Sequence, residues 1–311
     1  MESLIHQTFN NDFEVIVVED GSEFTSKDVV DHFSSSLNIR YFTKKNSGPG
    51  LTRNFGMNEA KGDYFIILDS DCILPSRYLT EVDDALTTNF TDVYGGADAS
   101  HESFTTIQKA INYTMTSMLT TGGLRGSKNL KSKFQPRSFN MGLSKKAFNA
   151  TNGFNEQRFG EDIELIFRLW QANFESQFIE KAFVFHKRRT DWKSFYKQVF
   201  NFGAARPILN RLYPYTAKIT YWFPSVFVIG FLLSIIAYVV GFKWLLVFYG
   251  LYFGFILFNC WYRNKSISVA VLGVFASLLQ FCGYGLGFLR SFFRLNILQK
   301  SVKNTFPRMF S

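Results

Sequence analysis

The stretch Tyr64–Asp71, which reads YFIILDSD, decides the fold, because a short apolar run ends there in two carboxylates. The first five residues are aromatic or aliphatic, a composition typical of a strand buried in a parallel sheet. A second run, Glu14–Val18, reads EVIVV and is also followed by acidic residues, Glu19 and Asp20. The two runs therefore predict two buried strands with carboxylates at their carboxyl ends.

The residues between these runs complete an alternation of strands and helices. Asn38–Phe42 predicts a further strand, and Leu51–Ala60 predicts a helix that begins after the turn Ser47–Gly50. This alternation is typical of an α/β fold with a doubly wound, Rossmann-like and mostly parallel sheet. In such sheets ligands bind outside the carboxyl ends of the strands, which is where both acidic clusters fall.

The formal charge of +9 is distributed unevenly along the chain. Eleven of the 34 basic residues lie from Arg206 onward, where no acidic residue occurs, which leaves 23 basic against 25 acidic residues before it. A nucleic-acid-binding protein would carry its basic residues on a polar, folded face. Here they flank apolar runs, which argues against a nucleic-acid partner and indicates membrane lipid with anionic headgroups.

Three apolar runs without charged residues occupy 221–241, 244–262 and 267–289. Each is close to the ~20 residues that a helix needs to cross ~30 Å of hydrocarbon. Aromatic residues fall at the run ends, as in an interfacial belt: Trp222, Trp244, Trp261 and Tyr262. We therefore expect an α/β domain at 1–205, a juxtamembrane linker at 206–220, an all-α transmembrane region at 221–289 and a basic tail at 290–311.

The side of the membrane that the tail occupies is a separate question. Three full crossings would place the tail opposite the first domain, against the tendency of basic residues to remain in the cytoplasm. We expect an even number of crossings, with one run re-entrant or packed against the others. The third run is rich in glycine, which permits breaks and close packing, and is the best candidate.

Asp69 and Asp71 are suited to binding a divalent metal. Alternate residues at the tip of a strand can bring two carboxylates together, and Mg²⁺ or Mn²⁺ is often held by one or two carboxylates plus phosphate oxygens. Two aspartates in a loop are by themselves more often turn residues that cap a helix. The buried strand before them favours the metal.

A second acidic pair, Glu161 and Asp162, begins a segment with helical spacing of its apolar residues. A carboxylate at a helix N-terminus near a metal can act as a general base. The spacing alone favours the alternative, in which the aspartate only caps the helix. A third segment, Val184–Arg189, reads VFHKRR and either contacts a phosphate or completes a metal shell, or is a solvated basic loop.

Together these segments resemble a family 2 glycosyltransferase of the GT-A type, from about Glu2 to Arg206. The resemblance rests on ordered motifs: QTF at 7–9, FEVIVVEDGS at 13–22, NSGPGLTRNFG at 46–56, AKGDY at 60–64, LDSD at 68–71, FNMG at 139–142, GF at 153–154 and GED at 160–162.

The resemblance implies a role for each candidate residue in an inverting, metal-dependent transfer of a sugar from a nucleotide-sugar donor. Asp20 would bind the base of the donor, and Lys44 and Arg53 would lie near the base, ribose or diphosphate. Asp69 would contact the ribose or the sugar. His186 and Arg189 would lie near the diphosphate. Asp71, with Asp69, would bind Mg²⁺ or Mn²⁺. Asp162 would be the general base, supported by Glu161.

The resemblance also implies a cellular setting. We expect a multi-pass protein of the inner (cell) membrane, with its catalytic domain in the cytoplasm and a part in cell-envelope polysaccharide biosynthesis. The acceptor would be a lipid-linked or cell-surface glycan. The QxxRW signature of processive synthases is absent; the nearest segment is Lys197–Asn201, so addition of single sugars is favoured.

Two alternatives and one departure from the family pattern stay open. The chain is also compatible with a polyprenyl-phosphate sugar transferase, or with a catalytically impaired membrane scaffold derived from a transferase. The family pattern opens with a strand ahead of the helix that ends in QTF, whereas this chain begins inside that helix. That strand would lie between the strands at 14–18 and 64–68, so we expect an upstream extension to add it.

Overall fold

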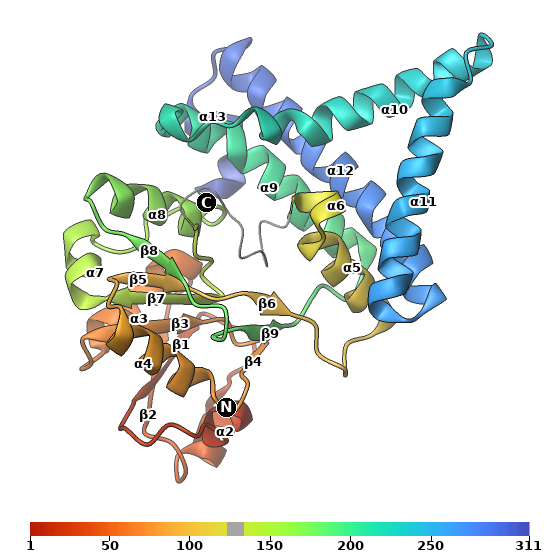
Figure 1. The fold of residues 1–311 in the computed structure, drawn as a ribbon. Helices are drawn as coiled ribbons and strands as arrows, with labels where there is room; N and C mark the ends of the chain where they lie inside the picture. The colour runs from red at the N-terminus through yellow and green to blue at the C-terminus, as the bar shows by residue number, and fades with distance from the viewer. Residues whose placement is uncertain (123–133, 311) are drawn as a thin grey trace. The chain divides into compact units, whose positions relative to one another are not determined.

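The computed structural model describes residues 1–122 and 134–310. Contacts divide the chain into two compact units. The first contains Met1–Ala99 and Ser127–His186 with the last two residues, and the second contains Ser100–Gly126 and Lys187–Met309. All strands of the described residues belong to the first unit, and the second is helical (Figure 1).

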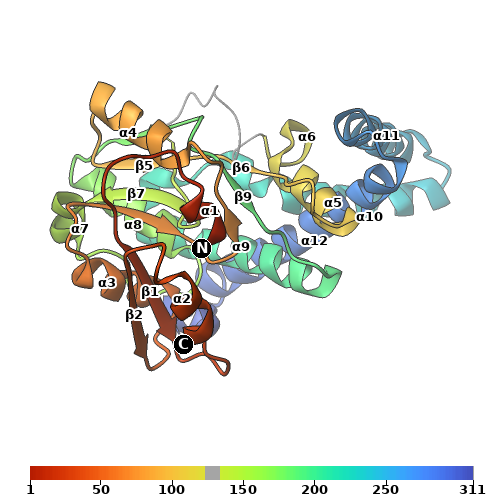
Figure 2. The ribbon, with the colours of Figure 1, turned by 90° about the horizontal axis from the view of Figure 1, so that it is seen from below.

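The first two strands form a parallel pair of their own. β1 (Val15–Asp20) lies beside β2 (Ile39–Lys44) in the register Asp20↔Lys44, and α2 (Lys27–Phe33) connects them. In both views β1 and β2 run side by side next to α2 (Figures 1 and 2). Helix α3 (Pro49–Glu59) follows β2, as the turn before it predicts.

The second sheet has the strand order β3-β7-β5-β8. Its members are β3 (Tyr64–Leu68), β7 (Asn140–Ser144), β5 (Val93–Gly95) and β8 (Ser176–Phe178). This sheet is mixed, because β7 is antiparallel to both β3 and β5 whereas β5 and β8 are parallel, and the expectation of a mostly parallel sheet is wrong in this detail. Strand direction is not readable from a buried apolar run, because both kinds of pairing bury the same residue types.

A third, small sheet has the order β4-β9-β6. β4 (Cys72–Ile73) follows the acidic residues of the Tyr64–Asp71 stretch, and β9 (Val184–His186) pairs with it antiparallel, with Cys72 opposite His186. β6 (Asp98–Ala99) completes the sheet in parallel with β9. This sheet brings two segments more than a hundred residues apart in sequence to one place.

Helices cover these sheets in the first unit. They are α1 (Glu2–Ile5), α4 (Tyr78–Thr88), α7 (Lys145–Thr151) and α8 (Glu161–Gln171), in addition to α2 and α3. Helix α8 begins at the acidic pair, as predicted, and buries Leu165, Ile166 and Leu169 in the core against the second sheet. Its polar first turn therefore lies at the end of a helix that is fixed by apolar packing.

The described residues of the second unit form helices and no strand. The helices are α5 (Thr106–Thr116), α6 (Met118–Thr121), α9 (Trp192–Leu212), α10 (Phe223–Val239), α11 (Trp244–Asn264), α12 (Ile267–Asn296) and α13 (Val302–Thr305), with the short 3-10 turns η1 (Pro214–Thr216), η2 (Ile219–Trp222) and η3 (Pro307–Met309). Position 205, where we expected the first domain to end, falls inside α9.

Helix α12 packs along α9 over much of its length (Figures 1 and 2). The approach depends on glycine: a methyl group at Gly287 would overlap the carbonyl oxygen of Phe200, and one at Gly203 would overlap that of Tyr284. The third apolar run is thus one continuous helix over Ile267–Asn296. Of the two alternatives that we expected for one run, it is packed against its neighbours and is not broken as a re-entrant segment.

Three helical segments are long and apolar enough to cross a membrane: Ile219–Val239, Trp244–Asn264 and Ile267–Asn296. The second and third begin close to the predicted positions and extend beyond the predicted ends. The third is the most buried inside the protein: 44% of its most apolar stretch of 18 residues is buried, compared with 17% for the first segment and 11% for the second. The first two expose most of their apolar surface, as helices that face lipid would.

Candidate active site

Most predicted site residues of the first unit lie at or next to the ends of its elements, whereas Arg53 lies in the middle of α3. Asp20 ends β1, Asp69 and Asp71 follow β3, Glu161 opens α8, and His186 ends β9. The fold therefore brings residues that are distant in sequence together in three local groups.

The first group is built on Asp20. Its carboxylate accepts hydrogen bonds from Lys44 Nζ at 2.6 Å and from the backbone N–H groups of Ser47 and Gly48, both at 2.9 Å. Partial burial acts to raise the pKa of Asp20, but these hydrogen bonds outweigh it and hold the pKa below its ordinary value. Asp20 and Lys44 thus fix the loop that enters α3.

The second group is centred on Arg53, which joins the two acidic motifs. Its guanidinium donates to Asp69 Oδ1 at 2.7 Å and to Glu161 Oε1 at 3.2 Å. Burial acts to lower the pKa of Arg53, but the two carboxylates outweigh burial and raise it above its ordinary value. The arginine is therefore a permanent cation that holds the end of β3 and the start of α8 together.

Glu161 is the most perturbed carboxyl group of the site. Burial, and then the negative charge of Asp162, raise its pKa to about 7, although Arg53 opposes the shift. The Asp162 carboxylate lies 3.7 Å from Arg137 and accepts the N–H of Ile163 at 2.8 Å. Gly160 is the N-cap residue, so neither acid occupies the N-cap position, although the bond from Ile163 means that Asp162 satisfies one free N–H of the first turn.

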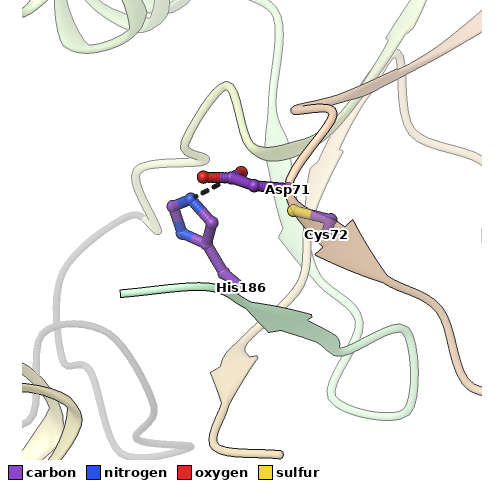
Figure 3. Close-up of side chains that lie close together, drawn as sticks. All are labelled: Asp71, Cys72 and His186. Carbon is purple, nitrogen blue, oxygen red and sulfur yellow. Dashed lines mark ion pairs between the residues drawn. The ribbon is translucent and has the colours of Figure 1, made fainter. Parts of the chain in front are cut away.

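The third group consists of Asp71, Cys72 and His186, whose potential ligand atoms lie within 4.8 Å of one another. Figure 3 shows the His186 ring turned toward the Asp71 carboxylate; His186 Nε2 is 3.3 Å from Asp71 Oδ1. The ring also stacks on Phe139, with centroids 4.5 Å apart. Its buried Nδ1 has no hydrogen-bond partner in the part of the chain that the structure describes.

This group fits a divalent cation through its oxygen and nitrogen donors. Carboxylate suits Mg²⁺ and Mn²⁺, and an imidazole beside it favours the transition-metal ion. Burial raises the pKa of the Cys72 thiol well above its ordinary value, and the thiol lies 3.5 Å from the carbonyl oxygen of Phe139, to which it donates. Mg²⁺ and Mn²⁺ prefer oxygen and nitrogen donors to sulfur, so Asp71 and His186 are the better-suited ligands of the three.

Two further predicted residues are not members of this group. Asp69 is not a member of the cluster and is paired with Arg53 instead. Arg189 belongs to the second unit, where its side chain is exposed. Its neighbour Arg188 is buried and donates to Asn112 Oδ1 at 3.1 and 3.0 Å, so one base of the HKRR run has a structural contact with α5.

Sequence reasoning missed three residues that line these groups. Arg137 pairs with Asp162, Phe139 stacks on His186, and Cys72 completes the ligand cluster. Phe139 is the first residue of the FNMG motif. The motif therefore indicated that this segment belongs to the site, but it did not predict that Phe139 stacks on His186. Arg137 stands in no recognisable pattern, and its contact with Asp162 arises only from the fold.

Comparisons with known proteins agree with this arrangement of motifs. Residues 1–150 match the model of the family described as Glycosyl transferase family 2. An uncharacterized glycosyltransferase of Rickettsia bellii is 42% identical over 71 residues, which is 23% of this chain and 10% of that protein. The chain thus matches only about a tenth of the length of this curated relative.

Two longer matches are more distant. A Campylobacter jejuni protein named GalNAc(5)-diNAcBac-PP-undecaprenol beta-1,3-glucosyltransferase is 24% identical over 209 residues, 66% of this chain and 63% of that protein. A mannosyltransferase from Pyrobaculum calidifontis, solved in complex with GDP-Man and Mn²⁺, superposes with a TM-score of 0.55 at 11% identity, over 93% of this chain and 81% of that chain. The second match supports the GT-A fold class.

Proposed function

We propose that this chain, whose residues 1–150 match the model of glycosyltransferase family 2, transfers a sugar from a nucleotide-sugar donor by an inverting, metal-dependent reaction. The observation that supports this most is the Asp71–His186 pair beside β3, because it offers metal ligands where a GT-A fold binds its donor. The Arg53 bridge connects this strand end to the acidic pair of α8.

Asp71 and His186 are proposed to hold Mn²⁺ or Mg²⁺. The ion, when bound, would neutralise the negative charge that develops on the departing diphosphate. Asp69 and Arg53 would orient the ribose, sugar or diphosphate of the donor, and Arg189 would contribute positive charge near the diphosphate. Asp20 and Lys44 are proposed to bind the base; in the structure they also position the loop that carries Ser47 and Gly48.

Asp162 is proposed to be the general base that accepts the proton of the attacking hydroxyl. Its pairing with Arg137 keeps its carboxylate oriented at the start of α8. Glu161 supports it: a carboxyl group whose pKa is raised to about 7 is partly neutral at physiological pH, which limits repulsion between the two neighbouring acids. Different environments would thus give two adjacent carboxyl groups different tasks.

The acceptor and the location are proposed from the second unit and from the relatives. The C. jejuni relative is named for an undecaprenol-linked substrate, and three helices of this chain are long and apolar enough to span a membrane. We propose a lipid-linked glycan acceptor, an inner-membrane location and a cytoplasmic catalytic domain. The proposed boundaries stay at 1–205, 206–220, 221–289 and 290–311.

A screen of acceptors with the purified full-length protein tests this function. Each nucleotide sugar of a panel is offered with Mn²⁺ and with either an undecaprenyl-diphosphate-linked glycan or undecaprenyl phosphate. The proposal predicts a product with the glycan, whose new anomeric configuration by NMR is opposite to that of the donor. Transfer to undecaprenyl phosphate alone would identify a polyprenyl-phosphate sugar transferase instead, and retention of configuration would contradict the assigned mechanism.

A further inference from the structure

A cavity in the second unit lies at the C-terminal end of α12, on residues with no role in the proposed reaction. Its volume is about 340 Å³, within the range of small-ligand sites. It is lined by Phe200, Asn201, Arg290, Arg294, Phe306, Pro307 and Arg308. Three of these seven side chains are arginines and none is acidic.

The arginines converge because of the fold. Arg290 and Arg294 are one turn apart on α12 and therefore lie on the same face of the helix. Arg308 stands in η3, on the tail segment that follows α13. Three guanidinium groups around one cavity repel one another, a cost that an anionic occupant would remove.

The walls of the cavity are held in place by described contacts. Arg294 Nη1 donates to the carbonyl oxygen of Thr305 at 3.1 Å, which ties the tail to α12, and Phe306 beside it is buried. Arg290 lies over the Phe200 ring, 5.7 Å from its centroid. Gly287 lets α12 approach α9 closely at Phe200. Phe200, which lines the cavity, is therefore fixed by the packing of these two helices.

We propose that this cavity binds a phosphate group carried by a lipid. Guanidinium groups bind phosphate oxygens through paired hydrogen bonds, which a lysine patch would not offer in the same geometry. The cavity is also at the end of a helix that is apolar enough to cross a membrane, and basic pockets beside such helices suit anionic headgroups. The exposed apolar surface at Phe293 and Ile297 would lie against the acyl chains.

The test is binding of dioctanoyl phosphatidic acid to the full-length protein in detergent, measured by calorimetry without donor, metal or acceptor. The variant is Arg290→Gln with Arg308→Gln, which keeps the Arg294–Thr305 contact. The control is Lys300→Gln with Lys303→Gln, which removes the same charge from the same tail at residues that do not line the cavity. We expect saturable binding that the arginine variant weakens about tenfold or more and the control changes less than about twofold.

Two further ligands identify the source of the phosphate. Inorganic phosphate that binds as tightly as the lipid, with the same dependence on the arginines, would overturn a lipid as the occupant. Dioctanoyl phosphatidylcholine should bind weakly, because its headgroup has no net charge. Equal weakening in both variants, or no saturable binding of phosphatidic acid, would overturn the proposed site. Because the experiment measures no sugar transfer, such a failure would not contradict the proposed function.

Discussion

The ionisation of Glu161 affects the stability of the folded protein. Its pKa is raised to about 7 in the folded protein from an ordinary value of 4.5, chiefly by burial. At pH values between these two, the folded state binds a proton that the unfolded chain has already lost. Stability contributed by this group is therefore present below about pH 4.5 and is lost as pH rises toward about 7.

We predict that Glu161→Gln removes this dependence. Without divalent metal, the melting temperature of the wild type should fall relative to that of the variant as pH rises from about 5 to about 7. The difference corresponds to on the order of 1–3 kcal/mol. Thermal unfolding of both proteins across this pH range measures it, and two parallel curves would show that Glu161 is ionised throughout in the folded protein.

The general-base assignment predicts a different signature for Asp162. Asp162→Asn should lower the turnover rate by at least about a hundredfold while changing donor affinity less than about threefold, because a base acts on the acceptor in the transition state. Steady-state kinetics and calorimetry with the donor give the two quantities. A fall in donor affinity that matches the fall in rate would show that Asp162 is a binding residue. The Glu161→Gln variant, measured in the same way, shows the effect of changing the neighbouring carboxyl group.

For single residues, the sequence indicates which acidic residues belong to the candidate site, but it does not predict which side chains they contact. Asp69 and Asp71 stand two residues apart, yet one pairs with Arg53 and the other with His186. Alternation along an extended chain points neighbouring side chains in different directions, and only the fold shows what lies there. Arg137 could not be predicted, because its contact with Asp162 joins segments that no local pattern relates.

Among the elements, the α9–α12 pair gives the sharpest test of packing. Gly287→Ala places a methyl group against the carbonyl oxygen of Phe200, and a packed helix pair relieves such an overlap only by moving apart. We predict a loss of about 1–3 kcal/mol, seen as a lower melting temperature in detergent. The matched control is Gly250→Ala in α11, where the added methyl group would meet no described atom within 4 Å.

That control should be neutral or slightly stabilising, since alanine is the better helix former by about 1 kcal/mol. A Gly287→Ala protein as stable as the control would contradict the close helix contact.

Element boundaries were predictable where hydrophobic periodicity is strong. The strands at 15–20 and 64–68 and the helix that begins at Glu161 follow directly from apolar runs and the residues that end them. The mixed pairing of the second sheet was not predictable, because the direction of β7 depends on the path of the chain and not on its own composition. The three-stranded sheet that pairs β9 with β4 was not predictable either. Its strands are only two or three residues long, which is too short to show a hydrophobic alternation.

At the scale of the whole molecule, we predict on which side of the membrane the catalytic domain and the basic tail lie. A protein without its native cysteines and with Lys45→Cys should resist a membrane-impermeant thiol reagent in intact cells and react after permeabilisation. Lys45 is exposed beside the proposed donor site, so labelling there reports the side of the catalytic residues. Labelling in intact cells would place the catalytic domain outside.

The same experiment with Lys300→Cys reports on the tail. We expect protection in intact cells, which corresponds to an even number of crossings and keeps the basic tail with the catalytic domain. Labelling of Lys300→Cys in intact cells would instead establish an odd number of crossings, as three simple spans by α10, α11 and α12 give.

The central claim is that Asp71 and His186 bind a metal that donor turnover requires. Its most direct measurement is release of the nucleoside diphosphate from a panel of nucleotide sugars, as a function of Mn²⁺ concentration, by the wild type and Asp71→Asn. The variant removes the ligand's charge with almost no change in volume, and its melting temperature without metal checks the fold. We predict metal-dependent release by the wild type, abolished by chelator, and at least a tenfold loss in the variant, about 1.4 kcal/mol of barrier stabilisation. Release that persists with chelator, or a variant above a tenth of wild-type activity, would contradict the claim.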